Sequence, residues 1–466
     1  MSRLSWARLQ AYRVIHRVNT EQSFARPLID TMIRNAELPR SGAASRFGAA
    51  SQSVDISQSE RDYAVLLALG VTAASGELDL IIDRSLTKRH LDAPLRTILQ
   101  IATYELVFLH KPAYAIVDQA VQLTRRILKR ATGFTNWAMH RITETAAGFP
   151  WGNTETDLVA LAHSCAFPLW LAEQITSELG VQNAATFMHT ANAPAPTFVQ
   201  DLTSGETYQT VIHEDTNLQA LLDSGQVIIA DAATQEVAGL VADVVARQVE
   251  RRKAEAPKPP PQEAAPQQLQ NPGEASLCTL LEVGSGRGTK TVLINRSLQR
   301  SQSLPYRHIA IDNLAFKTAQ TLERINTYQL TNVEALTADC LQLNTLIDND
   351  HLLPECFDVI FIDAPCSGSG TLRRHPETRW RLTPQSIHEL AEQGLAFLKA
   401  LAPHVADGGT LVYSTCSIFE SENEAVIREF LFCAEGLGFI PTNITRINPE
   451  NGDCHFAAVL QRGSLK

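Results

Sequence analysis

Residues 278–299 read CTLLEVGSGRGTKTVLINRSLQ, an apolar run that closes in glycines and is followed by a helix-like segment. The same alternation continues toward the C-terminus. Further apolar runs follow at 307–312 (RHIAID), 357–363 (FDVIFID) and 409–417 (GTLVYSTCS), with helix-like segments between them. Buried strands that are joined by helices form parallel sheets with helices on both faces. The C-terminal part of the chain is therefore predicted to be an α/β, Rossmann-like domain with a doubly wound sheet.

Chemistry-bearing residues stand at the carboxyl ends of these predicted strands, where doubly wound sheets bind their ligands. They are Gly284, Ser285, Gly286, Arg287, Gly288, Asp312, Asp339, Asp363 and Cys416. A glycine-rich turn lets the backbone approach a ligand closely. An acidic residue at the end of the second strand, here Asp312, typically binds a ribose diol. The glycine loop and Asp312 together predict a nucleoside-containing cofactor.

The loop sequence GSGRGTKT narrows the choice of cofactor. It nearly fits the phosphate-binding pattern G-x-x-x-x-G-K-T, but Thr289 stands where that pattern needs a glycine before the lysine. A dinucleotide-binding fingerprint would also need a third glycine at this position. S-adenosylmethionine has no phosphate group, and it therefore fits the loop best.

The first 145 residues read as helices, and no alternating strand pattern appears before residue 190. Residues 41–59 are predicted to be a polar loop or a long insertion. Residues 150–230 suggest a small α+β connector, with a short helix in AFPLWLAEQITSELG (166–180) and brief strands in APTFVQDL (195–202) and GQVIIAD (225–231). A predicted helix with a basic last turn follows at 232–253. Residues 255–276 then carry six prolines and have the composition of a linker.

The composition is that of a globular protein of about three domains, with 466 residues, 44% of them hydrophobic and 19% charged. No apolar run is long enough to span a bilayer, and the arginine-containing N-terminus does not resemble a secretory signal. We therefore expect a cytoplasmic protein. The eight cysteines include no CxxC pair, so neither a disulfide framework nor a metal site is expected.

The formal net charge of −10 is unevenly distributed. Residues 1–150 hold 19 Lys and Arg against 13 Asp and Glu, a balance of +6, whereas the other 316 residues hold 21 against 37, a balance of −16. A basic first third on an acidic chain indicates a polyanionic partner for that part.

Two cysteines lie just beyond predicted strands, in DAPCSGSGTLRRHPETRW (363–380) and YSTCSIFESENEAVI (413–427). Either cysteine alone would usually be a packed core residue, but both are embedded in small polar residues at strand ends. Here the sequence resembles the RNA (cytosine-5)-methyltransferases of the RsmB/Sun family. The first segment is similar to the family's proline-cysteine motif and the second to its nucleophile motif, and PENGDCHFAAVLQ (449–461) resembles its closing strand.

The resemblance covers essentially the whole chain. ARLQAYRVIHRV (7–18), the segment 95–123 and GFTNWAMHRI (133–142) are similar to the NusB-type, all-α RNA-binding domain that precedes the catalytic domain in this family. The resemblance implies three domains: a NusB-like domain at 1–147, an α+β connector at 148–231, and an S-adenosylmethionine-dependent methyltransferase domain at 232–466. The proline-rich stretch 255–276 is then an insertion inside the catalytic domain, where an exposed loop tolerates length.

The resemblance also implies the roles of site residues. Cys416 is the expected nucleophile, and Cys366 is expected to assist removal of the C5 proton and release of the product. Asp363 is expected between the cofactor and the base. The residues expected to bind the cofactor are Gly284, Ser285, Gly286, Arg287, Gly288, Thr289, Lys290, Asp312, Asp339 and Asp363. The family's loop usually reads C-A-A-P-G-G-K-T, so Gly288 and Lys290 align, whereas Arg287 replaces a proline.

The residue types suit this chemistry, because cytosine C5 is too weak a nucleophile until a thiolate adds to C6. The target base must be unstacked, so a loop or single-stranded region of RNA, most simply in 16S rRNA, is the expected partner of a monomeric enzyme. Arg373, Arg374, His375 and Arg379 follow Cys366, and we expect them to contact phosphates or stacked bases. Two alternatives stay open: a non-catalytic RNA-binding or ribosome-assembly factor, and the same chemistry on tRNA or DNA.

Overall fold

The computed structural model describes residues 4–37, 56–86, 90–211, 217–255, 277–301, 305–349, 353–449 and 451–463. Most of the predicted polar loop at 41–59 and nearly all of the proline-rich stretch at 255–276 lie outside these ranges. The chain divides into two compact units, one made of residues 1–194 and 372–382 and the other of residues 195–371 and 383–466. These divisions do not coincide with the predicted domain boundaries after residues 147 and 231. The predicted boundaries therefore remain predictions.

The first unit is helical, as the sequence predicts. Its helices are α1 (Trp6–Glu21), α2 (Ala25–Glu37), α3 (Gln58–Ala73), α4 (Ser75–Ser85), α5 (Ala93–Val107), α6 (Ala113–Ile127), α7 (Thr132–Thr145), α8 (Leu158–Cys165), α9 (Leu169–Leu179), α10 (Val181–Thr190) and the short α16 (Thr378–Arg381). Helix α5 is buried over most of its surface, including Leu95, Ile98, Leu99 and Ile101, and these residues belong to the core of this unit.

The second unit begins with a small antiparallel sheet in the order β2-β1-β3, formed by β1 (Thr197–Asp201), β2 (Thr207–Thr210) and β3 (Val227–Ile229). The short helix α11 (Leu218–Asp223) precedes β3, and the long helix α12 (Ala232–Glu255) follows it. The strands predicted in 195–202 and 225–231 are confirmed, whereas β2 lies in polar sequence that gave no strand pattern.

The main sheet has seven strands in the described part of the chain, in the order β6-β5-β4-β7-β8-β10-β9. They are β4 (Cys278–Val283), β5 (Tyr306–Asp312), β6 (Val333–Thr337), β7 (Phe357–Asp363), β8 (Val405–Thr415), β9 (Phe439–Ile447) and β10 (His455–Arg462). The first five in this order pair in parallel, and β10 pairs antiparallel with both β8 and β9. The predicted Rossmann-like class is confirmed, and the antiparallel edge is an addition to the predicted parallel sheet.

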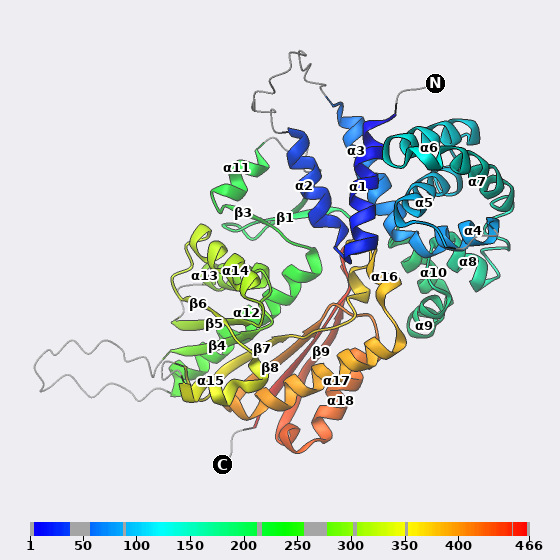
Figure 1. Ribbon diagram of the computed structural model, residues 1–466. Coiled ribbons are helices and arrows are strands. Elements are labelled where there is room, and N and C mark those ends of the chain that lie inside the picture. Colours follow the sequence, from blue (N-terminus) through cyan, green and yellow to red (C-terminus); the bar gives the residue numbers. More distant parts are fainter. Residues whose placement is uncertain are drawn as a thin grey trace, which may run out of the picture. The chain divides into compact units, whose positions relative to one another are not determined.

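Helices cover both faces of this sheet (Figure 1). One face packs against α12, α13 (Thr289–Arg300) and α14 (Ala315–Thr327), and the other against α15 (Leu343–Asn349), α17 (Pro384–Leu401) and α18 (Glu424–Phe432). The central strands are mostly apolar because both of their faces are buried, as in Val359, Ile360, Phe361 and Ile362 of β7. The carboxyl ends of β4, β5, β7 and β8 therefore meet at one edge of the sheet, where the predicted site residues stand.

Two negative findings hold for the described ranges. They contain no group of three or more His, Cys, Asp or Glu side chains placed to hold a metal ion. They also contain no single helix that is long and apolar enough to cross a membrane, although two sharply bent helix pairs, α3 with α4 and α8 with α9, pass on length and composition alone.

Candidate active site

The glycine loop after β4 packs tightly against the ends of the two neighbouring strands. The amides of Gly284 and Ser285 donate to the carbonyl of Ile311 at the end of β5, at 2.9 and 3.1 Å. Gly284 has a φ of +77°, and a Cβ atom at this position would lie 2.5 Å from the carbonyl oxygen of Asp363 at the end of β7. Only glycine fits such a position, because it has no Cβ and readily adopts positive φ.

Asp312 closes the loop from the β5 side. Its carboxylate accepts the amide of Gly286 and the amide of Leu314, both at 3.0 Å, and Lys317 Nζ lies 3.5 Å away. The side chain is buried, and it fixes the first turn of the glycine loop directly at the end of β5. The structure thus brings together the loop and the acidic residue that the sequence pairs, while the ribose-binding role of Asp312 stays a prediction.

The other residues predicted to bind the cofactor differ in their burial and in their contacts. Ser285 is buried, its carbonyl accepts the amide of Gly288 at 3.0 Å, and Arg287 is exposed. The hydroxyl of Thr289, the first residue of α13, accepts a bond from Arg324 at 2.5 Å. Asp339 is exposed and accepts the amide of Leu341 at 3.0 Å, which caps a short helical turn after β6. Of these four residues, Thr289 and Asp339 therefore have side chains held by structural contacts of their own.

Lys290 leaves the loop in the direction of β7. Its ammonium group forms an ion pair with Asp363 at 2.7 Å. Burial by itself lowers the pKa of Lys290, but Asp363 raises it, with further contributions from Cys416 and Glu282, and the net pKa lies above the ordinary value. Lys290 therefore remains a cation, and its interaction with Cys416 places a positive charge near that cysteine.

The two motif cysteines meet beyond the ends of β7 and β8. The sulfur atoms of Cys366 and Cys416 are 3.4 Å apart, and the Cys416 amide donates to the Cys366 sulfur at 3.3 Å. Both are free thiols. The hydrogen bond to Cys416 raises the pKa of Cys366 well above its ordinary value, and burial and the negative charges of Cys416 and Glu422 add to this effect. Cys366 is accordingly the member of the pair that holds its proton.

A buried carboxylate that the sequence did not reveal joins the two cysteine loops. Glu422 accepts the Ser367 amide at 2.6 Å, the Ser367 hydroxyl at 2.5 Å and the Ser417 hydroxyl at 2.5 Å. Ser369 bridges the same loops, since its hydroxyl is 3.1 Å from that of Ser417 and accepts the Ile418 amide at 3.0 Å. Each cysteine is followed by a serine bound to the same carboxylate, so the loops are fixed relative to each other.

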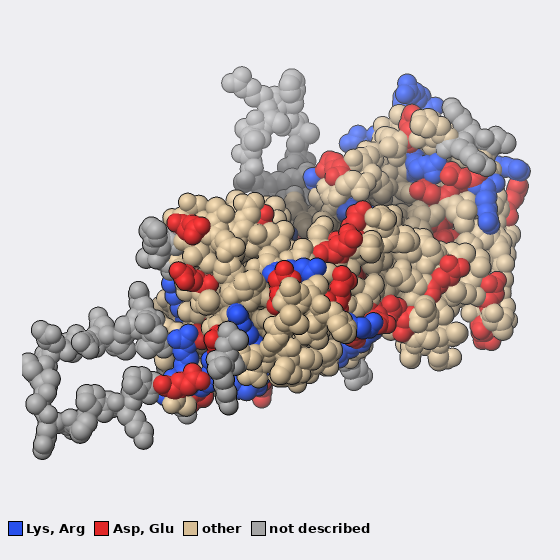
Figure 2. All heavy atoms as spheres, turned by 90° about the horizontal axis from the view of Figure 1, so that it is seen from below, with Lys and Arg blue, Asp and Glu red and all other residues tan. Residues whose placement is uncertain are grey.

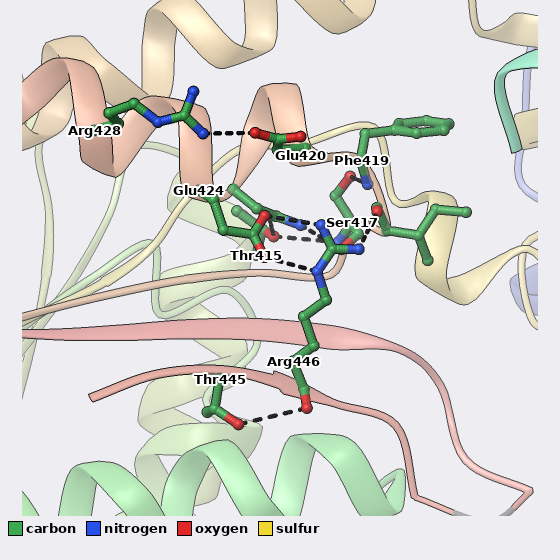
Figure 3. Close-up of polar contacts among 10 residues, drawn as sticks. Thr415, Ser417, Phe419, Glu420, Glu424, Arg428, Thr445 and Arg446 are labelled. Atoms are coloured by element: carbon green, nitrogen blue, oxygen red, sulfur yellow. Dashed lines mark hydrogen bonds and ion pairs between the residues drawn. The ribbon is translucent and has the colours of Figure 1, made fainter. Parts of the chain in front are cut away.

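The loop that carries Cys416 is also held from the side of β9 and α18. Figure 3 shows Arg446 of β9 paired with Glu424. Its guanidinium also donates to the Ile418 carbonyl at 3.1 Å. Asn423 accepts the Thr415 hydroxyl at 2.5 Å and donates to the Ser417 carbonyl at 2.9 Å. The backbone on both sides of Cys416 is thus fixed by side chains, which is the preorganisation that a nucleophile requires.

His455, at the start of β10, is a second site residue that the sequence did not reveal. It is 4% exposed, and its Nδ1 has no hydrogen-bond partner among the described residues. Its pKa is lowered to about 3, mainly by burial and in part by the nearby positive charge of Lys290. A neutral imidazole therefore lies near the Lys290 ammonium. The segment 449–461 marks this strand, but no spacing in the sequence relates its histidine to the lysine.

The basic segment after Cys366 was predicted to contact RNA, and the structure contradicts this prediction for one of its arginines. Residues 372–382 belong to the helical unit, where Arg379 is fully buried and donates to the carbonyls of Cys165, Ala166 and Ala191 and to the Asn192 side chain at 2.9–3.3 Å. Arg373 donates to the carbonyls of Ala193 and Pro194. The prediction that Arg379 contacts RNA is wrong, because its guanidinium is inaccessible and bonded to helix-terminal carbonyls.

Known proteins resemble the chain in both units. Residues 268–456 match the family described as 16S rRNA methyltransferase RsmB/F, and residues 5–143 match the NusB family. A probable ribosomal RNA small subunit methyltransferase B of Synechocystis is 27% identical over 446 residues, which cover 91% of this chain and 89% of that protein. The ribosomal RNA small subunit methyltransferase B of Shigella flexneri is 40% identical over 111 residues, 22% of this chain and 26% of that protein.

The whole fold has a counterpart among solved structures. The crystal structure of PH0851 superposes with a TM-score of 0.71 and covers 99% of this chain and 100% of its own, at 19% sequence identity. At that identity the likeness concerns the fold alone. It extends over both the helical and the sheet-containing parts.

Proposed function

The chain belongs to the RsmB/F family of 16S rRNA methyltransferases and carries a NusB-family domain, and we propose that it methylates C5 of a cytosine in 16S rRNA through a covalent adduct of Cys416. The observation that supports this most is the pair of free cysteines with sulfur atoms 3.4 Å apart, beside Lys290 and Asp363. Packing would not require two thiols in contact. An addition–elimination reaction at cytosine uses two groups, because one attacks C6 and the other removes the C5 proton so that the product is released.

S-adenosyl-L-methionine is the methyl donor of this methyltransferase family, and it supplies an electrophilic methyl group on a sulfonium. The loop fits it. A Cβ atom at Gly286, whose φ is +59°, would meet only open space, with Gly284 O the nearest atom at 3.9 Å. This space adjoins the Asp312 carboxylate, which binds the Gly286 amide. We propose that Asp312 holds the ribose hydroxyls and that the backbone of 284–290 lies along the rest of the donor.

The first step that we propose is attack by the Cys416 thiolate on C6 of an unstacked cytosine. The new S–C6 bond moves the electron pair of the C5–C6 double bond onto C5, which then takes the methyl group while the donor sulfur keeps the electron pair of the broken S–CH3 bond. Lys290 stabilises the thiolate before attack. Asp363 forms an ion pair with Lys290, and we propose that it hydrogen-bonds the cytosine edge.

The second step removes the C5 proton and frees the enzyme. In the free site, the Cys416 hydrogen bond and charge hold the pKa of Cys366 high. Adduct formation converts Cys416 into a neutral thioether, so this effect ends and the Cys366 thiol can lose its proton to solvent. The resulting thiolate accepts the C5 proton, the C5–C6 double bond forms again, and Cys416 leaves as a thiolate. The charge on one cysteine thus controls when the other can act.

Methyl transfer from labelled S-adenosylmethionine to unmodified 16S rRNA made in vitro tests this proposal. We expect one labelled nucleoside, identified as 5-methylcytidine after digestion, and no comparable labelling of tRNA. Label in another nucleoside would refute the chemistry, preferential labelling of tRNA would refute the substrate, and the absence of transfer to naked RNA and to small ribosomal subunits would favour a non-catalytic factor.

A further inference from the structure

The basic charge of the N-terminal unit is concentrated in one stretch of sequence. Between Asp118 and Glu144 the chain contains no acidic residue, although 50 of its 466 residues are Asp or Glu. The same 25 positions hold five basic residues, of which four lie within six positions: Arg125, Arg126, Lys129 and Arg130. We call these four residues the basic turn.

The basic turn joins two helices and is exposed throughout. Arg125 and Arg126 occupy the last turn of α6, whereas Lys129 and Arg130 lie on the 3-10 turn η1 (Lys129–Ala131) that leads into α7. The negative end of the α6 dipole accounts for two cations in its last turn. The helix dipole does not account for Lys129 and Arg130 on η1. It also does not account for the absence of acidic residues from the neighbouring sequence. Figure 2 shows one face of the molecule, on which Lys and Arg side chains stand out from the surface among Asp and Glu side chains.

The backbone beneath the basic turn is firmly held. The buried hydroxyls of Thr124 and Thr135 lie 3.0 Å apart and link α6 to α7, and the Leu128 amide donates to the Thr124 carbonyl at 2.7 Å. The Thr132 hydroxyl donates to the Lys129 carbonyl at 2.6 Å. The four cationic side chains are therefore presented from a fixed scaffold, so binding a polyanion orders only the side chains.

An exposed aromatic residue lies on the helix that follows. Trp137 of α7 is 47% exposed, and the ring of Phe134 supports it at a centroid distance of 5.5 Å. A Cβ atom at Gly133, one turn earlier on the same face, would meet nothing within 4 Å, so the approach to this face is open. Trp137 thus lies on the helix that directly follows the basic turn. A half-exposed indole combined with a cluster of cations suits unpaired nucleotides, since bases stack on the ring while cations contact phosphates.

We propose that the basic turn and Trp137 form the surface through which the helical unit binds the RNA substrate, with the four cations on successive phosphates and an unpaired base stacked on the indole. The proposal rests on the proposed function, because it takes RNA as the substrate. It places affinity for RNA on α6, η1 and α7, a part of the chain that holds none of the reacting groups.

Two pairs of substitutions in the full-length protein test this surface: Arg125→Gln with Arg126→Gln, and Lys129→Gln with Arg130→Gln. The matched control is Arg13→Gln with Arg17→Gln, which removes the same charge from exposed positions on α1. The affinity for unmodified 16S rRNA is measured over a range of salt concentrations. Each phosphate contact contributes about 0.7 to 0.9 to the slope of log K against log salt. We therefore expect each pair in the basic turn to lower that slope by about 1.5 and the control to leave it unchanged.

Trp137→Ala separates stacking from charge. We expect it to weaken RNA binding about tenfold at constant salt, within the range for loss of one base–aromatic stack, while the salt slope stays that of the unaltered protein. In all variants, binding of S-adenosylmethionine and kcat at saturating RNA should remain unchanged. A basic-turn pair with the slope and affinity of the α1 control would overturn the proposal. If the unaltered protein binds 16S rRNA through this surface but transfers no methyl group, the proposed function fails and the surface stands.

Discussion

The sulfur atoms of Cys366 and Cys416 lie 3.4 Å apart, although fifty residues separate them in the sequence. The sheet explains this approach, since β7 and β8 are parallel neighbours and each cysteine follows the end of its strand. The distance is far longer than a disulfide bond and suits a hydrogen bond between a thiol and a thiolate. The relationship has direct consequences for the behaviour of single variants.

The two cysteines should fail in opposite ways. Cys416→Ala should abolish methyl transfer and form no covalent species, because the attacking atom is missing. Cys366→Ala should still attack and methylate but release the product poorly, so a protein–RNA adduct that depends on S-adenosylmethionine should accumulate. A denaturing gel of each variant with labelled 16S rRNA shows the adduct as a shifted band.

The reverse pattern, with an adduct in Cys416→Ala alone, would exchange the two roles. If both cysteines only pack, each variant should lose about 1 kcal/mol of stability and neither should be trapped on RNA.

Asp312→Ala should weaken the binding of S-adenosylmethionine by about 1–3 kcal/mol. The substitution removes the acceptor of the Gly286 and Leu314 amides and the proposed partner of the ribose hydroxyls. Calorimetric titration measures the loss, and Asp348→Ala at an exposed position of α15 is the control. Equal affinities of the unaltered protein and Asp312→Ala would remove Asp312 from the cofactor site.

Arg379→Met should destabilise the helical unit by about 1–3 kcal/mol, because it leaves buried carbonyls around Cys165 and Ala191 without their donor. Arg373→Met is the matched control, since its bonds to Ala193 and Pro194 lie at the surface. Urea unfolding measures both. A loss of RNA affinity in Arg379→Met at unchanged stability would restore the original interpretation of this arginine as an RNA contact.

This arginine also shows where sequence reasoning reached its limit. Apolar runs predicted β4, β5, β7 and β8, and the ends of these strands predicted that the glycine loop and Asp312 belong to one site. The ion pair of Asp363 with Lys290 was not predicted. Periodicity carries no information about which unit a connecting segment joins, so residues 372–382 were assigned to the catalytic domain with Cys366. In the structure, Trp380 of this segment donates to the Ala73 carbonyl of α3.

The placement of 372–382 changes an expectation about truncation. The charge split and the predicted domain boundary after residue 147 suggest that a chain without residues 1–145 keeps a foldable catalytic unit. Such a truncation would also take away the helices that bury Trp380 and that bind Arg381 through the Ser23 carbonyl. A separable catalytic unit should therefore begin near residue 195 and carry a short replacement for 372–382.

The stability of the sheet-containing unit should fall on the acid side because of His455. Its pKa is about 3 in the folded protein and about 6.5 in an unfolded chain, so the unfolded state binds more protons between these values. This lowered pKa contributes stability that is complete above about pH 6.5 and is lost as the pH falls toward 3, by up to about 1.4 kcal/mol per pH unit. His455→Gln should remove part of this dependence between pH 6 and 4.

Urea unfolding at several pH values measures the effect. His388→Gln is the control, because His388 lies exposed on α17. Parallel pH profiles for His455→Gln and the unaltered protein would show that the imidazole is not held neutral.

Glu422 should act on the rate of methyl transfer through the geometry of the cysteines rather than on binding. Its carboxylate accepts hydrogen bonds from Ser367 and Ser417, the residues directly after Cys366 and Cys416. Burial raises its pKa, and the serine hydrogen bonds oppose that shift. Glu422→Gln replaces one acceptor oxygen by an amide nitrogen that can only donate, so at least one of these hydrogen bonds must reverse its direction or break, and the loops lose part of the constraint that the carboxylate imposes. We expect kcat to fall at least tenfold while KM for RNA and for S-adenosylmethionine stays within twofold, as misplacement of a reacting group predicts.

Glu420→Gln is the matched control, since Glu420 pairs with Arg428 at the surface (Figure 3). Equal loss of kcat in both variants would assign the effect to charge, and a loss of stability with unchanged kcat would make Glu422 a purely structural residue.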